Sequence, residues 1–515
     1  MKMRCKSLMI QGTGSHVGKS ILVAAFCRIL RQDGYGVAPF KSQNMALNSF
    51  ITREGGEIGR AQAVQAEAAG LEPHVDMNPI LLKPSSDVGA QVIIHGRVYK
   101  NMSARLYHES KSHVADFVRQ SFRRLEERYD FIVIEGAGSP AEINLRENDI
   151  ANMGMAEIAD CPVVLVGDID RGGVFASLVG TMELLEEKER RRVKGFIINK
   201  FRGDVSLLLP GIDFLEKKTG VPVLGVVPYF RDIYLQEEDG VAIDRLISRQ
   251  QTGKIEIAVI YLPHISNFTD FDPLEREPDV SLRYVGRGER IGKADAVIIP
   301  GSKNTIDDLS YLYNTGGVAE ILRHYREGGT IVGICGGYQM LGEYIEDPHH
   351  VETNLGKLNG IGLLPVITAI EKEKMTSQIR AKVHPSNPFF TNRDELTGYE
   401  IHMGKTSFQR KNYMFEIVRR EGPPVSVPDG FISDDGRVWG TYIHGIFDND
   451  DFRREFVRRV KSEKSLPVAS ASAGEGEGEP RFNYEEFKET QYDALAALVR
   501  EHIDMKAFYR IAGLK

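Results

Sequence analysis

Cys335 stands in a sequence context that suits a nucleophile. It follows the apolar run TIVGI, has Gly333, Gly336 and Gly337 around it, and precedes YQMLGEYI, which begins like a helix. A strand that turns sharply into a helix strains the backbone of its apex residue, and small neighbours allow that turn. The helix N-terminus favours the reactive thiolate, and amide N–H groups at the turn can hold an oxyanion. We therefore predict that Cys335 is a nucleophile rather than a small apolar residue that ends a core strand.

A thiolate nucleophile needs a base, and two histidines lie at suitable strand positions. His444 ends the strand-like run VWGTYIH, and His402 lies in the similar run GYEIHMG. Cys335 and His444 are 444 − 335 = 109 residues apart, so only the fold can bring them together. The cysteine and histidine resemble those of the class I glutamine amidotransferases, which hydrolyse glutamine and release ammonia. Spacing alone does not separate the two histidines, and the position in that family favours His444.

The same resemblance implies an acid that orients the histidine and a loop that binds the oxyanion. The family often has a glutamate two residues after the histidine, but this chain has Ile446 there. Asp448 and Glu400 are then the candidates for the orienting acid. In the family, a Pro-Gly loop donates an oxyanion-hole amide, which would come here from Gly301 or Ser302.

A second centre is indicated near the N-terminus by SLMIQGTGSHVGKS, which reads as a strand, a glycine-rich loop and the start of a helix. The usual P-loop spacing is met when it is counted from Thr13, through Gly14 and Gly18, to Lys19 and Ser20. Glycines let backbone N–H groups face phosphate oxygens. Lys19 would neutralise the terminal phosphates, and Ser20 would ligate Mg²⁺. The loop resembles that of dethiobiotin synthetase, and ATP is the expected ligand.

Polar residues near other strand ends complete this predicted nucleotide site. Glu135 ends the apolar run FIVIE, where a carboxylate can complete the Mg²⁺ shell. Glu57 precedes an alanine-rich helix and is either a second metal ligand or an ordinary acid in a first helical turn. Asn199 ends another apolar run, where P-loop folds of this kind contact the adenine base. The carboxyl ends of parallel strands form the ligand crevice of an open α/β sheet.

Strand-like runs alternate with helical stretches, which predicts an α/β protein with parallel, doubly wound sheets. A polar stretch at 238–254 marks a domain boundary. We expect an ATP-binding amidoligase domain at 1–250, with a P-loop sheet like that of dethiobiotin synthetase. A class I amidotransferase-like α/β domain should follow at 251–460. Residues 461–515 should form a flexible linker, poor in apolar residues, and a C-terminal helix.

The composition argues against several other classes of protein. Hydrophobic residues make up 42% and charged residues 27% of the chain, which is ordinary for a soluble globular protein. The net charge of −7 argues against a nucleic-acid or membrane-surface binder. No apolar run is long enough to span a bilayer, no signal peptide is recognisable, and the four cysteines show no paired spacing. We expect a cytoplasmic enzyme with small-molecule partners, and the sequence leaves open whether it forms a homo-oligomer.

A closer resemblance rests on the number and order of several motifs. They run from about residue 7 to about residue 458 and comprise MALNS, EIGRAQ, MNPILLKP, EGAGSPAEINL, DIDRGGVFA, INKFRGD, CGGYQMLG and YIHGIFD. Together they are similar to the amidotransferases of cobalamin biosynthesis. The resemblance implies ATP, Mg²⁺ and glutamine, and a corrinoid acid, adenosylcobyrinic a,c-diamide, that is amidated at its b, d, e and g carboxylates through an acyl phosphate.

Two rival interpretations remain open at this point. A synthase that makes cobyrinic acid a,c-diamide would share both halves of the chain. A P-loop partition or signalling ATPase with an inactive amidotransferase-like domain belongs to a different class, in which replacement of Cys335 by alanine would leave function intact.

Overall fold

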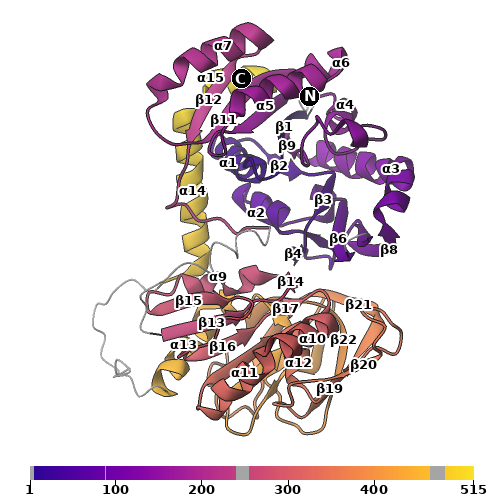
Figure 1. The fold of residues 1–515 in the computed structure, drawn as a ribbon, viewed down its shortest axis with the longest axis vertical. Helices are drawn as coiled ribbons and strands as arrows, with labels where there is room; N and C mark the ends of the chain where they lie inside the picture. Colours follow the sequence, from indigo (N-terminus) through magenta and orange to yellow (C-terminus); the bar gives the residue numbers. More distant parts are fainter. Residues whose placement is uncertain (1–4, 87–88, 239–254, 464–481, 515) are drawn as a thin grey trace. The chain divides into compact units, whose positions relative to one another are not determined.

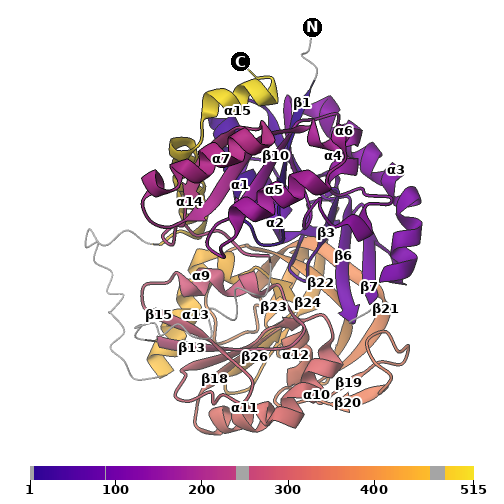
Figure 2. The ribbon, with the colours of Figure 1, turned by 45° about the horizontal axis from the view of Figure 1, so that its top comes forward.

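The computed structural model describes residues 5–86, 89–238, 255–463 and 482–514. The chain folds into two compact units (Figure 1, Figure 2). The first contains the described residues of 1–46, 56–236 and 486–515, and the second those of 47–55 and 237–485. The C-terminal segment therefore belongs to the same unit as the N-terminal strand.

The first unit is built on a six-stranded parallel sheet with the order β12-β11-β10-β1-β9-β2. Its strands are β1 (Lys6–Gly12), β2 (Val37–Phe40), β9 (Phe131–Glu135), β10 (Val163–Asp168), β11 (Val193–Phe201) and β12 (Val223–Pro228). Alternate residues of β1 enter two separate apolar clusters, Met9 one of them and Leu8 and Ile10 the other. Both faces of the sheet are therefore packed, which explains why its strands read as continuous apolar runs.

Helices and a smaller sheet complete the first unit. The helices are α1 (Lys19–Gln32), α2 (Arg60–Ala68), α3 (Ala104–Arg128), α4 (Met153–Ile158), α5 (Val174–Leu184), α6 (Glu187–Arg190), α7 (Leu209–Thr219), α14 (Tyr484–His502) and α15 (Met505–Ala512). The smaller sheet contains β3 (Gln43–Met45), β6 (Ile80–Ser86), β7 (Gly89–Ile94) and β8 (Arg97–Ser103), and β5 (Glu57–Gly59) leads into α2. Figure 2 shows α15 beside β1.

The second unit has its own sheet, with the order β15-β13-β16-β18-β26-β25. Its strands are β13 (Ile255–Ile260), β15 (Val280–Val285), β16 (Ala296–Ile299), β18 (Thr330–Ile334), β25 (Phe431–Ile432) and β26 (Val438–Thr441), and only β25 runs antiparallel to its neighbour. Figure 1 shows α10 (Thr305–Thr315), α11 (Gly317–Arg326) and α12 (Gly336–Leu341) gathered beside this sheet. The short helices η4 (Phe268–Phe271) and α9 (Asp272–Glu275) follow β14 (Ile265–Ser266), which is the next strand along the chain after β13.

A mixed sheet and a strand pair carry further parts of the second unit. The mixed sheet contains β19 (Tyr344–Glu346), β20 (Lys357–Asn359), β21 (Val366–Val383), β22 (Leu396–Phe408), β23 (Phe415–Arg419), β24 (Pro424–Asp429) and β27 (Ile443–His444). β14 (Ile265–Ser266) pairs with β17 (Gly301–Ser302), and β4 (Ser49–Ile51) also belongs to this unit. After β27 come η5 (Ile446–Asp448) and α13 (Asp450–Glu463).

The prediction of parallel α/β architecture is confirmed in both units. Of the polar stretch at 238–254, the structure describes only residue 238. The segment 464–481 lies wholly outside the described residues. Within the described residues, no helix is long and apolar enough to cross a membrane.

Candidate active site

Cys335 lies at the apex of the turn between β18 and α12. Its backbone has a φ of 51° and a ψ of −106°, a conformation that costs a non-glycine residue about 1–3 kcal/mol. The turn is closely packed: a Cβ on Gly337 would lie 2.0 Å from the carbonyl oxygen of Ile299. A Cβ on Gly336 would lie 2.9 Å from the amide nitrogen of Ser302. The glycines are therefore needed for a turn that brings the cysteine to the carboxyl end of β18.

Cys335 is near enough to His444 for its side chain to affect the pKa of the imidazole, while the Cys335 thiol itself donates to the carbonyl oxygen of Ile401 at 3.5 Å. Both residues are buried, with exposed fractions of 1% for His444 and 6% for Cys335. Burial opposes protonation of the imidazole, but the Asp270 carboxylate and the Cys335 side chain raise the pKa of His444 to about 10. A protonated imidazole beside a cysteine favours the thiolate form. The geometry thus suits a nucleophile and its partner acid–base group.

Asp270 is the acid that contacts this histidine. His444 Nδ1 and Asp270 Oδ2 are 2.6 Å apart, and the amide of Gly445 donates to Asp270 Oδ1 at 3.1 Å. Because Nδ1 faces the carboxylate, Nε2 is left to act on the sulfur and on substrate. Asp270 is not among the acids indicated by the sequence, although it follows a buried strand of the second sheet. That position, in the segment after β13, is the signal that could have found it.

Asp270, and neither of the acids considered from sequence, is the partner of His444 Nδ1. Glu400 is buried in β22 and accepts hydrogen bonds from Arg420 at 2.8 and 3.0 Å. Its other neighbour is His402 Nε2, at 3.5 Å, and His402 Nδ1 lies 2.8 Å from the carbonyl oxygen of Gly404. Asp448 lies in η5. Glu400 and His402 thus form a separate network with Arg420.

Backbone amides near the sulfur could hold an oxyanion. In the antiparallel pair β14–β17, the amide of Lys303 donates to the carbonyl of His264 at 2.9 Å. Because amides alternate in direction along such a strand, the amide of Ser302 points away from β14. The packing of Ser302 against Gly336 brings this amide to the turn that carries Cys335. Of the two residues considered from sequence, Ser302 has the amide with the suitable direction.

Three buried polar atoms around this turn have no hydrogen-bond partner among the described residues. They are His444 Nε2, Gln339 Oε1 and Tyr338 Oη. Gln339 Nε2 is engaged, because it donates to Tyr442 Oη at 3.2 Å. Unsatisfied buried polar atoms are costly, and a polar ligand bound at this turn would supply partners for His444 Nε2 and Gln339 Oε1.

The glycine-rich loop of the first unit joins β1 to α1. Gly18 has a φ of 98°, and a Cβ there would lie 2.2 Å from Asn199 Nδ2, so only glycine fits. Lys19 is buried, and its Nζ donates to the carbonyl oxygens of Gly14 at 2.8 Å and Gly138 at 3.0 Å. A Cβ added at Gly14 would meet no atom within 4 Å, so the loop is open at that point. The loop therefore has open space at Gly14 and the buried ammonium group of Lys19 on its inner side.

Asn199 supports this loop from the end of β11. Its Nδ2 donates to the carbonyl oxygen of Val17 at 2.8 Å. Lys200 Nζ reaches the carbonyl oxygen of His16 at 2.5 Å and Asp168 Oδ2 at 2.8 Å. The contact of Asn199 with adenine stays a prediction.

Glu135 is the most heavily hydrogen-bonded carboxylate in the first unit's site. Lys41 Nζ and Ser20 Oγ each donate to Oε1 at 2.8 Å. Gln65 Nε2 donates to Oε2 at 2.5 Å, with Gln62 Nε2 at 3.4 Å. Burial raises the pKa of Glu135, but Lys41 and the other donors outweigh it and hold the pKa below its usual value. The group is therefore a buried carboxylate that stays ionised.

A divalent cation fits the chemistry of Ser20 and Glu135. Mg²⁺ prefers hard oxygen ligands and usually takes one or two carboxylates, with phosphates and water in its other positions. The described residues contain no group of three or more His, Cys, Asp or Glu that could hold a metal, and a P-loop magnesium needs none. Glu57 is 1% exposed and pairs with Lys83 Nζ at 2.8 Å, and its role as a metal ligand stays a prediction.

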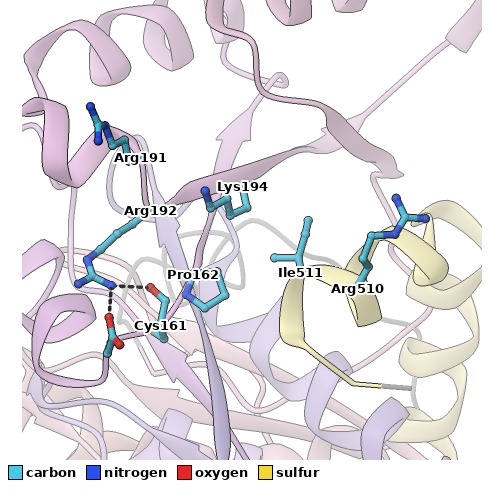
Figure 3. Close-up of a pocket in the computed structure, with 8 residues that line it drawn as sticks. Cys161, Pro162, Arg191, Arg192, Lys194, Arg510 and Ile511 are labelled. Atoms are coloured by element: carbon cyan, nitrogen blue, oxygen red, sulfur yellow. Dashed lines mark hydrogen bonds and ion pairs between the residues drawn. The ribbon is translucent and has the colours of Figure 1, made fainter.

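A separate pocket of about 480 Å³ lies at the opposite edge of the first unit's sheet. Its walls come from residues before β10 and at the start of β11, and from α15. Figure 3 shows Arg191, Arg192 and Lys194 on one side, and Arg510 with Ile511 on the other. Because the P-loop follows the carboxyl end of β1 and this pocket lies at amino ends of parallel strands, it is not part of the nucleotide site.

Comparisons with known proteins agree with this geometry. The family model for the CobQ/CobB/MinD/ParA nucleotide binding domain matches residues 8–243. The model for the CobB/CobQ-like glutamine amidotransferase domain matches residues 256–452. They confirm the predicted order of a nucleotide-binding unit followed by an amidotransferase unit.

Some curated proteins match this chain over nearly its whole length. The chain is 53% identical to the cobyric acid synthase of Syntrophobacter fumaroxidans, over 99% of each chain. It is 56% identical to that of Thermoanaerobacter sp., over 98% of each chain. Among solved structures, a chain of PurLQS from Thermotoga maritima covers 40% of this chain with 19% identity and a TM-score of 0.30, which is too low to support an inference.

Proposed function

The chain belongs to the family of cobyric acid synthases, glutamine-hydrolysing ligases of cobalamin biosynthesis, and we propose that it amidates a corrinoid acid at the expense of ATP and glutamine. The substrate would be adenosylcobyrinic a,c-diamide, and the product, amidated at the b, d, e and g carboxylates, would be adenosylcobyric acid. One observation supports this most strongly. A single chain carries a Cys335–His444–Asp270 constellation and a P-loop beside an ionised carboxylate, Glu135.

The second unit would release ammonia from glutamine. The Cys335 thiolate attacks the side-chain amide carbon, and the carbonyl oxygen becomes an oxyanion that the Ser302 amide can hold. Imidazolium Nε2 of His444 gives its proton to the departing nitrogen, so ammonia leaves and a glutamyl thioester remains. His444 then takes a proton from water, the hydroxide attacks the thioester, and glutamate leaves with the thiolate restored.

Asp270 would make both proton transfers possible. Its carboxylate holds Nδ1 of His444, which fixes the ring orientation and stabilises the imidazolium. The distance of 2.6 Å is that of a strong, charge-assisted hydrogen bond.

The first unit would activate the acid. Backbone amides of the loop from Thr13 to Lys19 and the Lys19 ammonium suit the phosphates of ATP. Mg²⁺ held by Ser20 and Glu135 would neutralise charge on those phosphates. The corrinoid carboxylate takes the γ-phosphoryl group to give an acyl phosphate and ADP. Ammonia then attacks the acyl carbon, phosphate leaves, and an amide forms.

Mass spectrometry of the corrinoid product tests the proposal directly. The purified chain is incubated with ATP, Mg²⁺ and glutamine and, in parallel reactions, with adenosylcobyrinic a,c-diamide or with cobyrinic acid, and the amides added to the a,c-diamide or to the acid are counted. Four new amides are expected. Amidation of cobyrinic acid at a and c instead would identify the a,c-diamide synthase, and ATP hydrolysis without any amide formation would favour a partition or signalling ATPase.

A further inference from the structure

The C-terminal segment has no part in the mechanism above, yet it packs on the nucleotide-binding unit. The family models match residues 8–243 and 256–452, so this segment lies beyond both of them. The apolar residues of α14, α15 and the connection between them that join the core around α1 are Tyr492, Leu495, Ala496, Val499, Ile503, Phe508 and Ala512. The ring of Phe508 stacks on that of Phe26 in α1, with centroids 4.3 Å apart. These two helices are therefore an integral layer of the first unit (Figure 1).

Ion pairs fix this layer to α1, the helix that begins at the P-loop. Arg28 is 7% exposed and pairs with Glu489 at 2.9 Å and Asp493 at 2.7 Å. Arg500 pairs with Asp33, directly after the end of α1, at 3.0 Å. Ion pairs with a buried partner are better defined than exposed ones, so α14 has a single register along α1.

A second set of contacts joins α14 to α2. The carboxylate oxygen Oε2 of Glu67 accepts from Lys488 Nζ at 3.0 Å and from Tyr492 Oη at 2.8 Å. Burial raises the pKa of Glu67, but Lys488 and Tyr492 outweigh it and hold the pKa below its usual value. The carboxylate is thus ionised and held by two donors from one helix.

The other side of α2 carries the residues that hold Glu135. Gln62 and Gln65 are at most 1% exposed, and both reach Oε2 of Glu135. Gln65 also donates to the carbonyl oxygen of Ser20 at 3.3 Å. Since α2 has only nine residues, a shift of Glu67 would move Gln65, two positions earlier, with it.

We propose that Lys488 and Tyr492 are positioning residues for the nucleotide site: by holding Glu67 they fix α2, so that Gln62 and Gln65 keep the Glu135 carboxylate aimed at the magnesium position. The inference rests on the proposed role of Glu135 as a metal ligand. It gives α14 a part in nucleotide binding, although neither Lys488 nor Tyr492 touches the nucleotide site.

The test compares nucleotide binding with and without metal. Lys488→Met combined with Tyr492→Phe removes both donors and keeps most of the apolar contact of each side chain. Calorimetry with a non-hydrolysable ATP analogue should give a Kd about three- to tenfold higher in Mg²⁺, the size expected for a residue that acts through others. The Kd in EDTA should be unchanged, because Glu135 does not act without the cation. A merely structural weakening would raise both Kd values.

Matched variants sharpen the result. Lys488→Arg keeps a donor and should restore most of the Mg²⁺-dependent affinity, and Lys506→Met on the exposed side of α15 should have no effect. In a double-mutant cycle, Lys488→Met and Gln65→Ala should be non-additive in the presence of Mg²⁺.

Two results would overturn the inference: equal weakening in Mg²⁺ and EDTA, or additivity of Lys488→Met with Gln65→Ala. The binding assay needs no corrinoid. A wild-type chain that binds Mg²⁺ and nucleotide but amidates nothing would therefore contradict the proposed function and leave this inference standing.

Discussion

At the scale of single residues, the proposed glutaminase reaction depends on a buried histidine with a raised pKa. Desolvation alone would leave His444 neutral, but Asp270 and Cys335 raise its pKa well above the ordinary value of 6.5. An imidazolium beside a cysteine supports the thiolate and supplies the proton that ammonia needs to leave.

Cys335→Ala removes the nucleophile and leaves the first unit intact. We expect loss of amide formation with glutamine and retention of amide formation with added ammonium salt, because free ammonia bypasses the thioester. Amide formation is measured with each nitrogen source. Continued use of glutamine by this variant would contradict the assignment of the nucleophile.

Asp270→Asn tests the acid that the structure adds to the site. Glutamine hydrolysis should fall on the order of a thousandfold or more in kcat/KM, the scale seen when the acid of a catalytic triad is neutralised. Asp448→Asn is the matched control and should stay close to wild type. If the Asp448 variant lost activity instead, the orienting role would belong to that residue.

The pH profile of Asp270→Asn gives a second measure of the same contact. In the wild type, the raised pKa keeps His444 protonated to higher pH than a free histidine. Without the carboxylate, the imidazolium loses its proton at lower pH, so the alkaline limb of kcat/KM should move to lower pH. An unchanged alkaline limb in the residual activity would show that Asp270 does not set the charge of His444.

At the scale of elements, the decisive feature is the close packing of α12 against β16. The Gly337 backbone lies so near the carbonyl of Ile299 that there is no room for a methyl group. The same contact holds the start of α12 directly behind the carboxyl end of β18, so the placement of Cys335 and the packing of α12 are coupled.

Gly337→Ala should therefore destabilise the second unit by about 1–3 kcal/mol or more, since its Cβ meets backbone atoms that cannot move independently. Trp439 is the only tryptophan, lies buried in β26 and reports on the unfolding of this unit in urea. Gly180→Ala in α5, where a Cβ would meet nothing within 4 Å, is the control and should leave the Trp439 transition unchanged. A Gly337→Ala variant as stable as wild type would contradict the described packing.

At the scale of the whole molecule, the two proposed half-reactions are assigned to units with separate cores. Each half of the reaction can then be disabled alone. Lys19→Ala should abolish amide formation with glutamine and with ammonia, because acyl phosphate formation needs the phosphate site in either case. Glutamate release should persist. Amide formation from ammonia by this variant would contradict the P-loop assignment.

Much of this organisation could be read from local patterns. A buried parallel strand is a continuous apolar run, and a strand-to-helix turn needs glycine, so runs such as TIVGI and FIVIE predicted where strands end and which residues follow them. The alternation of strands and helices predicted the fold class for the same reason. These signals act over a few residues, and the sequence displays them directly.

Contacts between distant segments were not readable in this way. Asp270 and His444 are 174 residues apart, and no local rule selects that acid over Asp448 or Glu400. Likewise, helical spacing predicted a C-terminal helix but not its contact with α1 and α2. Local backbone preferences depend on each residue and its near neighbours in the sequence. Contacts such as that of Asp270 with His444 depend instead on which surfaces meet when the chain packs.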